Sequence, residues 1–278
     1  MTPRELIRRT AAAFREAGVP DPEVDAALLL SHVMGQAPLL LRTDDWTALP
    51  SDALSAFDAL AQRRLNREPL QYILHSQSFL GRDFYVDKRV LIPRPETELL
   101  AERAIACLKD KGPDATALDL CCGSGCIAAS LALAVPGVKV HACDLSGGAL
   151  AVASRNAEAL GAAVTLHQGD LFRATEGLIF DVIVSNPPYI PTAECAELQR
   201  EVLLEPSMAL DGGADGLDFY RRIAQESPAY LAPGGVLLLE VGHDQAAAVQ
   251  QLLASTGFHD ILAHEDYQQI QRMIEAHH

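Results

Sequence analysis

The feature that most constrains this chain is an alternation of short β-rich runs with helical patterns from Ala115 onward. The β-rich runs are Ala117–Leu120, Val138–Cys143, Val164–His167, Asp181–Ser185 and Val236–Val241. The helical patterns between them are Ile127–Ala134, Leu150–Leu160, Leu217–Leu231 and Gln245–Ala254. Strands that alternate with helices form a mostly parallel sheet with both faces covered. We therefore predict an α/β fold, to which Phe258–Ala263 and Arg272–Ala276 add two terminal strands.

The first ~70 residues have helical rather than alternating patterns. Thr2-Pro3-Arg4-Glu5 predicts a capping box at the start of a first helix. Asp21-Pro22 predicts a second helix that ends near Gly35, and Ser51 is predicted to cap a third. These helices carry no chemical motif, so the region is either a packing domain or a domain that docks a substrate.

The character of the sequence changes after Tyr72. Aromatic and β-branched residues around Gly81 predict a hairpin, and Ile92-Pro93-Arg94-Pro95-Glu96 interrupts regular structure. We predict a helical domain for packing or substrate docking over 1–71, a hairpin and linker over 72–95, and the α/β domain over 96–278.

Net charge, apolar run length and cysteine spacing argue against several classes of protein. The formal net charge is −15, which does not favour a general nucleic-acid binder. Arg63, Arg64 and Arg67 form the nearest basic group, and we expect them on the solvated face of a helix. The sequence shows no signal peptide and no apolar run of membrane-spanning length, so we expect a cytoplasmic protein. The six cysteines show neither a disulfide framework nor metal-ligand spacing, so we expect reduced thiols and no metal.

A glycine turn follows the first of these strands. Its sequence is Asp119-Leu120-Cys121-Cys122-Gly123-Ser124-Gly125-Cys126. In an open α/β sheet such a turn lies at the carboxyl ends of the strands, where ligands bind, and its glycines allow the backbone to approach a ligand closely. Asp144 ends the next strand, where an acidic residue suits the hydroxyls of a ribose.

Gly123, Gly125 and Ala128 also match the G-x-G-x-x-A pattern of a dinucleotide site. Asp119 favours a different ligand, because a carboxylate before the turn repels a pyrophosphate and attracts an ammonium group. S-adenosylmethionine carries an ammonium, a ribose and an adenine, and Asp170 follows the third strand where an acceptor for the adenine amine is needed. The alternative is that these aspartates only cap helices or turns, which is harder to sustain for three successive strand ends.

Asn186-Pro187-Pro188-Tyr189 follows another apolar strand and therefore faces the same edge. Pro187 forces Asn186 to be extended, the side-chain oxygen of Asn186 is an acceptor, and the prolines stiffen the loop without adding donors. Tyr189 offers a flat face to a planar group. The side-chain oxygen of Asn186 and the backbone carbonyls of the loop are acceptors, and Tyr189 is a stacking face. Together they suit a planar –NH2 group whose nitrogen attacks an incoming methyl group. The alternative is a proline-rich surface turn.

With these motifs the chain resembles the class I S-adenosylmethionine-dependent methyltransferases that modify planar amino nitrogens. Within them it is similar to the HemK-type peptide chain release factor glutamine methyltransferases. The segments that carry this closer resemblance are Phe84–Asp87, Val90–Glu98, Glu205-Pro206, Ala209–Gly213, Asp215–Leu217 and Leu238–Gly242.

The resemblance implies a Rossmann-like, mostly parallel sheet of seven strands and transfer of methyl to N5 of the glutamine in the Gly-Gly-Gln motif of release factors. It implies that the cofactor contacts Asp119, Cys121, Cys122, Gly123, Ser124, Gly125, Asp144, Asp170, Leu171 and Asn186. It implies that the glutamine amide is held, and the transfer catalysed, by Asn186, Pro187, Pro188 and Tyr189, with Arg94 and Glu96 bordering the cleft. We expect a monomer whose partner is the release factor, with no direct contact to nucleic acid or membrane.

The sequence departs from the family at Cys121 and Cys122, which replace the usual glycine and threonine, and at Asp266–Gln269, which lacks a frequent glycine. The second candidate substrate is a glutamine of a large-subunit ribosomal protein, and the third is N6 of an adenine in a nucleic acid. A non-catalytic cofactor-binding protein is disfavoured by the presence of Asn186.

Overall fold

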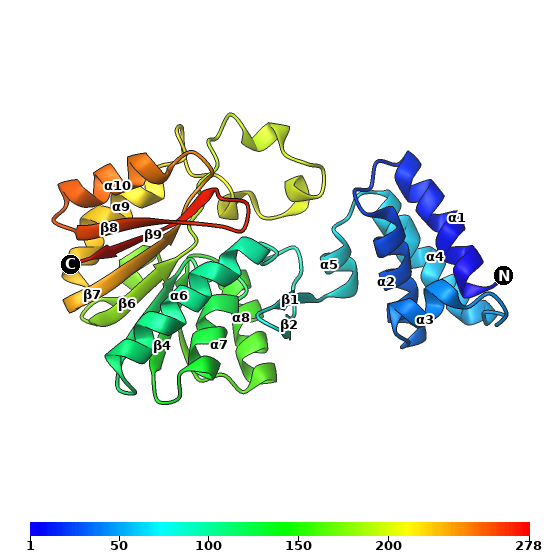
Figure 1. Cartoon of the computed structure of the whole chain (residues 1–278), viewed down its shortest axis with the longest axis horizontal. Helices are drawn as coiled ribbons and strands as arrows, with labels where there is room; N and C mark the ends of the chain where they lie inside the picture. The colour runs from blue at the N-terminus through cyan, green and yellow to red at the C-terminus, as the bar shows by residue number, and fades with distance from the viewer. The chain divides into compact units, whose positions relative to one another are not determined.

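The computed structural model describes residues 1–278, which form two compact units. The helical unit comprises residues 1–76 and 199–204, and the sheet unit comprises 77–198 and 205–278 (Figure 1). The hairpin that we grouped with the linker therefore belongs to the sheet unit. A short segment from the second half of the chain belongs to the helical unit, which no sequence pattern indicated.

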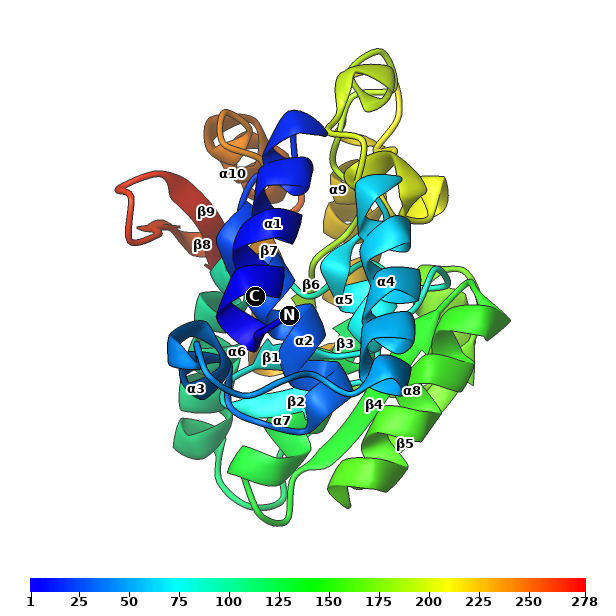
Figure 2. The same ribbon diagram turned by 90° about the vertical axis from the view of Figure 1, so that its right-hand side faces the viewer.

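The helical unit consists of α1 (Pro3–Glu16), α2 (Pro22–Met34), α3 (Pro38–Thr43), α4 (Ser51–Leu65) and α5 (Leu70–Leu74). Helices α1, α2 and α4 lie side by side (Figure 2) around a core that includes Leu6, Phe14, Leu30 and Phe57. The short helices α3 and α5 were not predicted.

Two of the three predicted helix ends are confirmed and one is wrong. The Thr2 hydroxyl accepts the backbone N–H of Glu5 at 3.3 Å, as the capping box requires. Gly35 ends α2 in the left-handed conformation, with φ +63°. The predicted cap at Ser51 is wrong: Pro50 occupies the N-cap, and no side chain caps α4.

The expectation that Arg63, Arg64 and Arg67 all lie on the solvated face of a helix is also wrong, since Arg67 follows the end of α4. Arg64 is only 4% exposed, and its guanidinium donates to Asp25 at 2.7 Å and to Glu201 at 2.8 Å. Arg67 donates to the same Glu201 carboxylate at 2.6 and 2.7 Å. A buried guanidinium needs such partners because its desolvation is otherwise costly. These ion pairs hold the segment 199–204 in the helical unit.

The sheet unit contains a seven-stranded sheet of order β5-β4-β3-β6-β7-β9-β8. Its strands are β3 (Thr116–Leu120), β4 (Lys139–Asp144), β5 (Val164–Gln168), β6 (Phe180–Ser185), β7 (Leu231–Glu240), β8 (His259–Glu265) and β9 (Gln271–His277). All neighbours are parallel except β9, which is antiparallel to both β7 and β8. The predicted fold class is confirmed, including both terminal strands.

Helices cover both faces of the sheet because successive side chains of a buried parallel strand point to opposite faces. Ala117 of β3 faces a core shared with α6 (Pro95–Lys111), α7 (Cys126–Ala134) and α8 (Gly147–Leu160). Leu118 faces a second core with α9 (Asp218–Glu226) and α10 (Ala246–Ser255). Figure 1 shows the two layers of helices on either side of the strands. The helix predicted to run to Leu231 ends at Glu226, since Pro228 cannot donate the next helical hydrogen bond.

Two turns complete the sheet unit. The hairpin pairs β1 (Gln77–Phe79) with β2 (Arg82–Phe84), and Gly81 turns the chain with φ +70°. In the segment Asp266–Gln269, Gln269 takes a left-handed conformation with φ +63°, and the Asp266 carboxylate accepts the N–H groups of Gln268 and Ile270. A side-chain cap thus supports the turn before β9.

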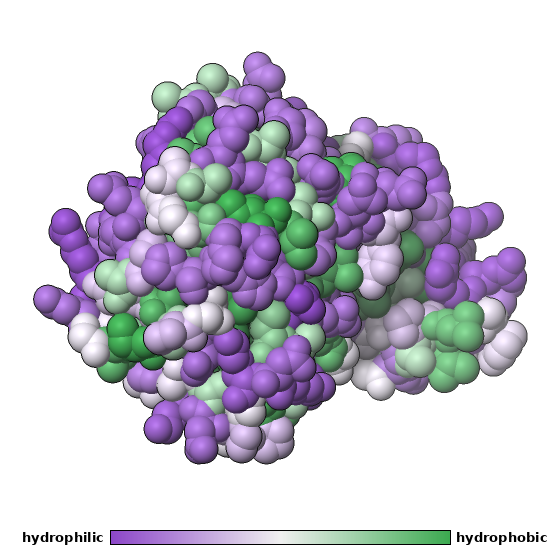
Figure 3. Space-filling model, turned by 60° about the vertical axis from the view of Figure 1, so that its left-hand side comes forward, coloured by the Kyte–Doolittle hydropathy of each residue, from purple (hydrophilic) through white to green (hydrophobic).

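The surface in Figure 3 is mainly hydrophilic, with apolar residues in small patches between polar ones. None of the helices combines the length and apolarity that crossing a membrane requires.

Candidate active site

The glycine turn between β3 and α7 is held open by positive φ angles. Gly123 and Gly125 have φ +53° and +75°, and Cys121 has φ +61° although it carries a side chain. A Cβ at Gly125 would lie 3.0 Å from the Cβ of Ala153, so glycine is also needed there for close packing on α8. The turn therefore brings its backbone close to the edge of the sheet at the two glycines.

Asp144 at the end of β4 anchors this turn. Its carboxylate accepts the N–H of Gly123 at 2.9 Å and the N–H of Ser146 at 2.9 Å. A carboxylate has about four acceptor positions, so two remain for a ligand. Burial raises the pKa of Asp144, and the two backbone donors oppose that rise. The group is thus a prepared acceptor for a pair of hydroxyls.

Asp119 lies behind the turn and is only 1% exposed. One oxygen, Oδ2, accepts the N–H of Ala128 in the first turn of α7 at 3.0 Å, while Oδ1 has no partner. Burial raises the pKa of Asp119 to about 8. An unpaired buried carboxyl oxygen is unfavourable unless a ligand supplies a donor or a positive charge.

The Asn-Pro-Pro-Tyr loop after β6 is held by segments far away in the chain. Ile190 donates to Leu210 O at 2.9 Å and accepts from Gly212 N at 2.8 Å. A Cβ at Gly212 would lie 2.7 Å from Tyr189 Cα and 2.8 Å from Pro188 O. The Gln245 amide donates to Tyr189 O at 2.9 Å. The glycine-rich segment after Leu210 therefore supports the loop by close backbone contact.

Asn186 points one end of its amide into the protein. Its Nδ2 donates to the Thr97 hydroxyl at 3.2 Å, and that hydroxyl donates to the Glu240 carboxylate at 2.7 Å. The other end, Oδ1, receives no donor from the protein. Burial raises the pKa of Glu240 to about 7, and hydrogen bonds from Thr97 and, to a smaller extent, from the Asn186 amide itself oppose the rise.

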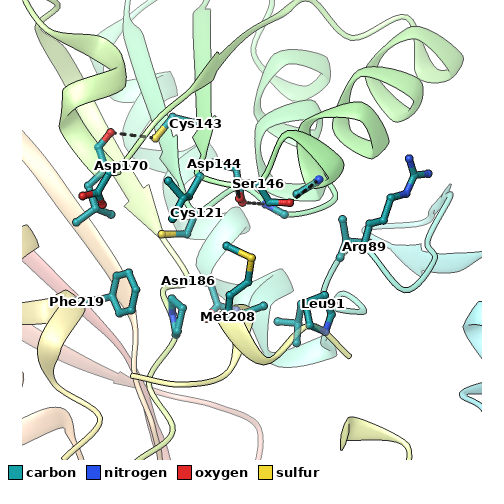
Figure 4. A pocket seen from close by; sticks show the side chains of 18 of the residues that line it. Arg89, Leu91, Cys121, Cys143, Asp144, Ser146, Asp170, Asn186, Met208 and Phe219 are labelled. Carbon is teal, nitrogen blue, oxygen red and sulfur yellow. Dashed lines mark hydrogen bonds between the residues drawn. The ribbon is translucent and has the colours of Figure 1, made fainter. Parts of the chain in front are cut away.

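A cavity of about 380 Å³ joins the two loops, within the ~300–1,000 Å³ typical of small-molecule sites. Of the predicted site residues, those on its wall are Cys121, Gly123, Asp144, Asp170, Leu171, Asn186 and Pro188. Figure 4 shows Asp144 and Cys121 on one side of this space and Asn186 on another. The remaining predicted residues, which do not line it, are Asp119, Cys122, Ser124, Gly125, Pro187 and Tyr189.

The cavity wall also contains residues that the sequence analysis did not assign to the site. They are Arg89, Val90, Leu91, Cys143, Leu145, Ser146, Ala149, Gly169, Pro206, Ser207, Met208, Ala209, Asp211 and Phe219. In Figure 4 Phe219 and Met208 lie on either side of Asn186. The segments around Leu91 and Met208 are fastened by Glu205, which accepts Ile92 N–H at 2.9 Å and the Arg94 guanidinium at 2.5 Å. The Glu205-Pro206 pair was the available sequence signal.

Three predicted site residues have contacts or positions that their expected roles did not include. Asp170 forms an ion pair with Arg222 of α9 at 2.9 Å. Arg94 binds Glu205 and is not on the cavity wall. Tyr189 lines a different, smaller cavity with Arg272 and Gln245, and burial raises the pKa of its phenol.

Burial also raises the pKa of the four thiols around the turn, Cys121, Cys122, Cys126 and Cys143. They remain protonated at neutral pH, and a thiol is far less readily oxidised than a thiolate.

Taken together, the parallel sheet with a reversed last strand, the glycine turn backed by an acidic strand end and the Asn-Pro-Pro-Tyr loop define a class I methyltransferase. Comparison with known proteins gives the same class. A family model described as "Methyltransferase small domain" matches residues 97–270, and one described as "PrmC N-terminal domain" matches residues 5–74.

Curated relatives narrow the class to a family. A release factor glutamine methyltransferase of Geobacter sulfurreducens is 45% identical over 98% of this chain and 95% of its own length. One from Chlorobaculum tepidum is 44% identical over 96% and 94%. A solved 16S rRNA N2 methyltransferase of T. thermophilus, in complex with AdoMet and guanosine, shares the fold, with TM-score 0.52 and 21% identity over 73% of this chain and 49% of its own. The chain belongs to the release factor glutamine methyltransferase family.

Proposed function

We propose that this enzyme transfers a methyl group from S-adenosylmethionine to N5 of the glutamine in the Gly-Gly-Gln motif of peptide chain release factors. The observation that carries the proposal is Asn186, whose Oδ1 lacks a protein donor at the edge of a cavity that also contains the glycine turn and Asp144. The full-length similarity to release factor glutamine methyltransferases supports the choice of substrate.

The residues present fit the proposed cofactor, which supplies an electrophilic methyl group when bound. The two free acceptor positions of Asp144 suit ribose hydroxyls. Asp119 Oδ1 is a buried oxygen without a donor, and we assign it to the ammonium group, reached through the glycine turn. Asp170 lies on the cavity wall, and we assign it to the adenine amine. Its carboxylate also forms an ion pair with Arg222.

The chain's own contribution to transfer is orientation. We propose that Asn186 Oδ1 and a backbone carbonyl of the loop accept the two N–H groups of the glutamine amide. Holding both N–H groups directs the nitrogen lone pair toward the methyl group, and such positioning provides much of the rate in reactions of this kind. No strong base is needed before transfer, because the methylated nitrogen is acidic and loses a proton afterwards.

The helical unit is proposed to bind the release factor. It has its own core and no group suited to the chemistry, and a family model specific to this type of N-terminal domain matches it. A role in substrate docking therefore accounts for it better than packing alone.

The test compares acceptors. Labelled cofactor is incubated with the enzyme and, separately, with an unmodified release factor, a large-subunit ribosomal protein fraction, duplex DNA and RNA. We expect label only in the release factor and none in its Gln→Ala variant. Label in the ribosomal fraction or the nucleic acids, with none in the release factor, overturns the proposed substrate.

A further inference from the structure

Glu240 and Thr97 are buried and form a series of hydrogen bonds that ends at Asn186. Thr97 is the third residue of α6, and Glu240 is the last residue of β7. The sheet register pairs Ser185 with Leu239, so Asn186 and Glu240 follow side by side at the carboxyl ends of β6 and β7. Thr97 and Glu240 are each 3% exposed, so water does not compete for these hydrogen bonds.

The chemistry of the three groups fixes which group donates and which accepts in each hydrogen bond. An ionised carboxylate only accepts hydrogen bonds, so the Thr97 hydroxyl must donate its one proton to Glu240, at 2.7 Å. The Thr97 oxygen can then only accept, and at 3.2 Å it accepts from Nδ2 of Asn186. This leaves Oδ1, at the other end of the amide, as the acceptor that the side chain can offer to the cavity that Asn186 lines.

We propose, on the basis of the proposed function, that Glu240 and Thr97 are positioning residues that hold the Asn186 amide with its oxygen toward the substrate amide. Without an obligate acceptor behind Thr97, the hydroxyl can donate to either end of the asparagine. An inverted asparagine presents N–H groups to the N–H groups of the glutamine, so the amide is not bound in a reactive orientation.

Protonation of Glu240 removes the fixed order of donors and acceptors in these hydrogen bonds, because a carboxylic acid can itself donate to Thr97. The raised pKa of Glu240, about 7, puts this change near neutrality. The groups that face Glu240 are Glu96 of α6, Arg272 of β9, Tyr189 after β6, Tyr220 of α9 and Cys126 of α7. The pKa values of Tyr189, Tyr220 and Cys126 are all raised, so these three stay neutral through this range.

The first test is independent of activity. The chain has three asparagines, Asn66, Asn156 and Asn186, so labelling with 15N-asparagine gives three side-chain amide signals. The Asn186 signal is identified by its loss in Asn186→Ala. We expect its 15N shift to titrate near pH 7 in the wild type and to be constant in Glu240→Gln. An Asn186 signal with the same shift and pH dependence in the wild type, Glu240→Gln and Thr97→Val overturns the proposal, whatever the substrate is.

The second test is kinetic and uses the release factor. Thr97→Val keeps the shape of the side chain but removes the hydroxyl, and we expect kcat to fall ~10–100-fold, as for other groups that orient a functional side chain. Thr97→Ser should stay within ~3-fold of the wild type, and the cofactor Kd should be unchanged in both variants. The control is Thr116→Val, which loses hydrogen bonds to Ile179 and Asp181 at the opposite end of β3 and should keep full kcat.

The kinetic outcomes separate the two proposals. A wild-type kcat in Thr97→Val, or equal losses in Thr97→Val and Thr97→Ser, overturns the positioning role. An inactive wild type that still binds the cofactor overturns the proposed substrate, while the asparagine titration continues to decide the positioning role.

Discussion

The two loops that meet at the cavity are held in different ways. The glycine turn takes most of its shape from its own backbone: its left-handed angles at Cys121, Gly123 and Gly125 lie within five consecutive positions, and Asp144 of the neighbouring strand anchors it. The Asn-Pro-Pro-Tyr loop has no such run of left-handed residues and depends on Thr97, Gly212 and Gln245. The first loop is mainly a local motif with one tertiary anchor, and the second is held mainly by tertiary contacts.

This contrast predicts that the two loops can be disabled separately. The largest effect is expected for Asn186→Ala, which removes the acceptor for the substrate. We predict a loss of ~10³-fold in kcat, comparable to removing a key polar group from other active sites. The cofactor Kd, measured by calorimetry, should change by less than ~10-fold because the glycine turn is intact. A variant that methylates at the wild-type rate would show that the acceptor is elsewhere.

Gly212→Ala tests the tertiary support of the second loop. The new Cβ would lie within 2.9 Å of three backbone atoms, so the loop or the glycine segment must move. A displacement of ~1 Å can cost ~10²-fold in rate, and we expect a loss of that size in kcat/KM with little change in cofactor Kd. The matched control is Gly148→Ala, whose Cβ would make only ordinary contacts of 3.5 Å or more. Equal activity of the two variants would remove the argument for close backbone support.

Asp119 gives the glycine turn a predicted pH dependence. With its pKa raised to about 8, Asp119 is mostly protonated at pH 6 and must lose its proton to pair with an ammonium group. Cofactor affinity should therefore rise with pH, by up to ~10-fold per unit between pH 6 and 7.5, below the ~7.7–8.0 at which an α-amino group itself deprotonates.

Calorimetry in two buffers of different ionisation enthalpy measures the proton released on cofactor binding. Asp119→Asn should bind more weakly, with a pH slope near zero, while Glu240→Gln should keep the wild-type slope. A wild-type affinity that is flat over this range would mean that Asp119 does not face the ammonium group.

The smallest effect is expected on the stability of the glycine turn. Gly125→Ala places a side chain at φ +75° and against Ala153, so the free energy of unfolding should fall by about 1–2 kcal/mol, the usual cost of a left-handed non-glycine residue. Ala153→Gly removes the Cβ contact at 3.0 Å but leaves the Ala153 Cα at 3.2 Å and the backbone strain, and it costs about 1 kcal/mol by itself inside α8. Urea denaturation should therefore show that Gly125→Ala costs somewhat less in the Ala153→Gly background than in the wild type, and no cost at all in that background would mean that packing alone requires the glycine.

The contrast also explains what the sequence could predict. Periodicity and motif positions predicted the sheet, its terminal strands and most of the glycine turn, because those signals lie within short segments. The sequence did not reveal the hidden position of Asp119, the ion pair of Asp170 with Arg222, or the burial of Arg64. Each of these depends on residues brought together by the fold. Thr97 and Glu240 stood in recognisable segments, but only the register of β6 and β7 brings them to Asn186.

The central claim is that Asn186 and its loop direct methyl transfer to a side-chain amide nitrogen. The most direct measurement is mass spectrometry of the peptide that contains the Gly-Gly-Gln motif, digested from a release factor after incubation with enzyme and S-adenosylmethionine. We predict a gain of one methyl group, assigned by fragmentation to the glutamine side chain, and no gain with the Asn186→Ala enzyme. A methyl group on another residue, or an equal gain with the variant, would contradict the account.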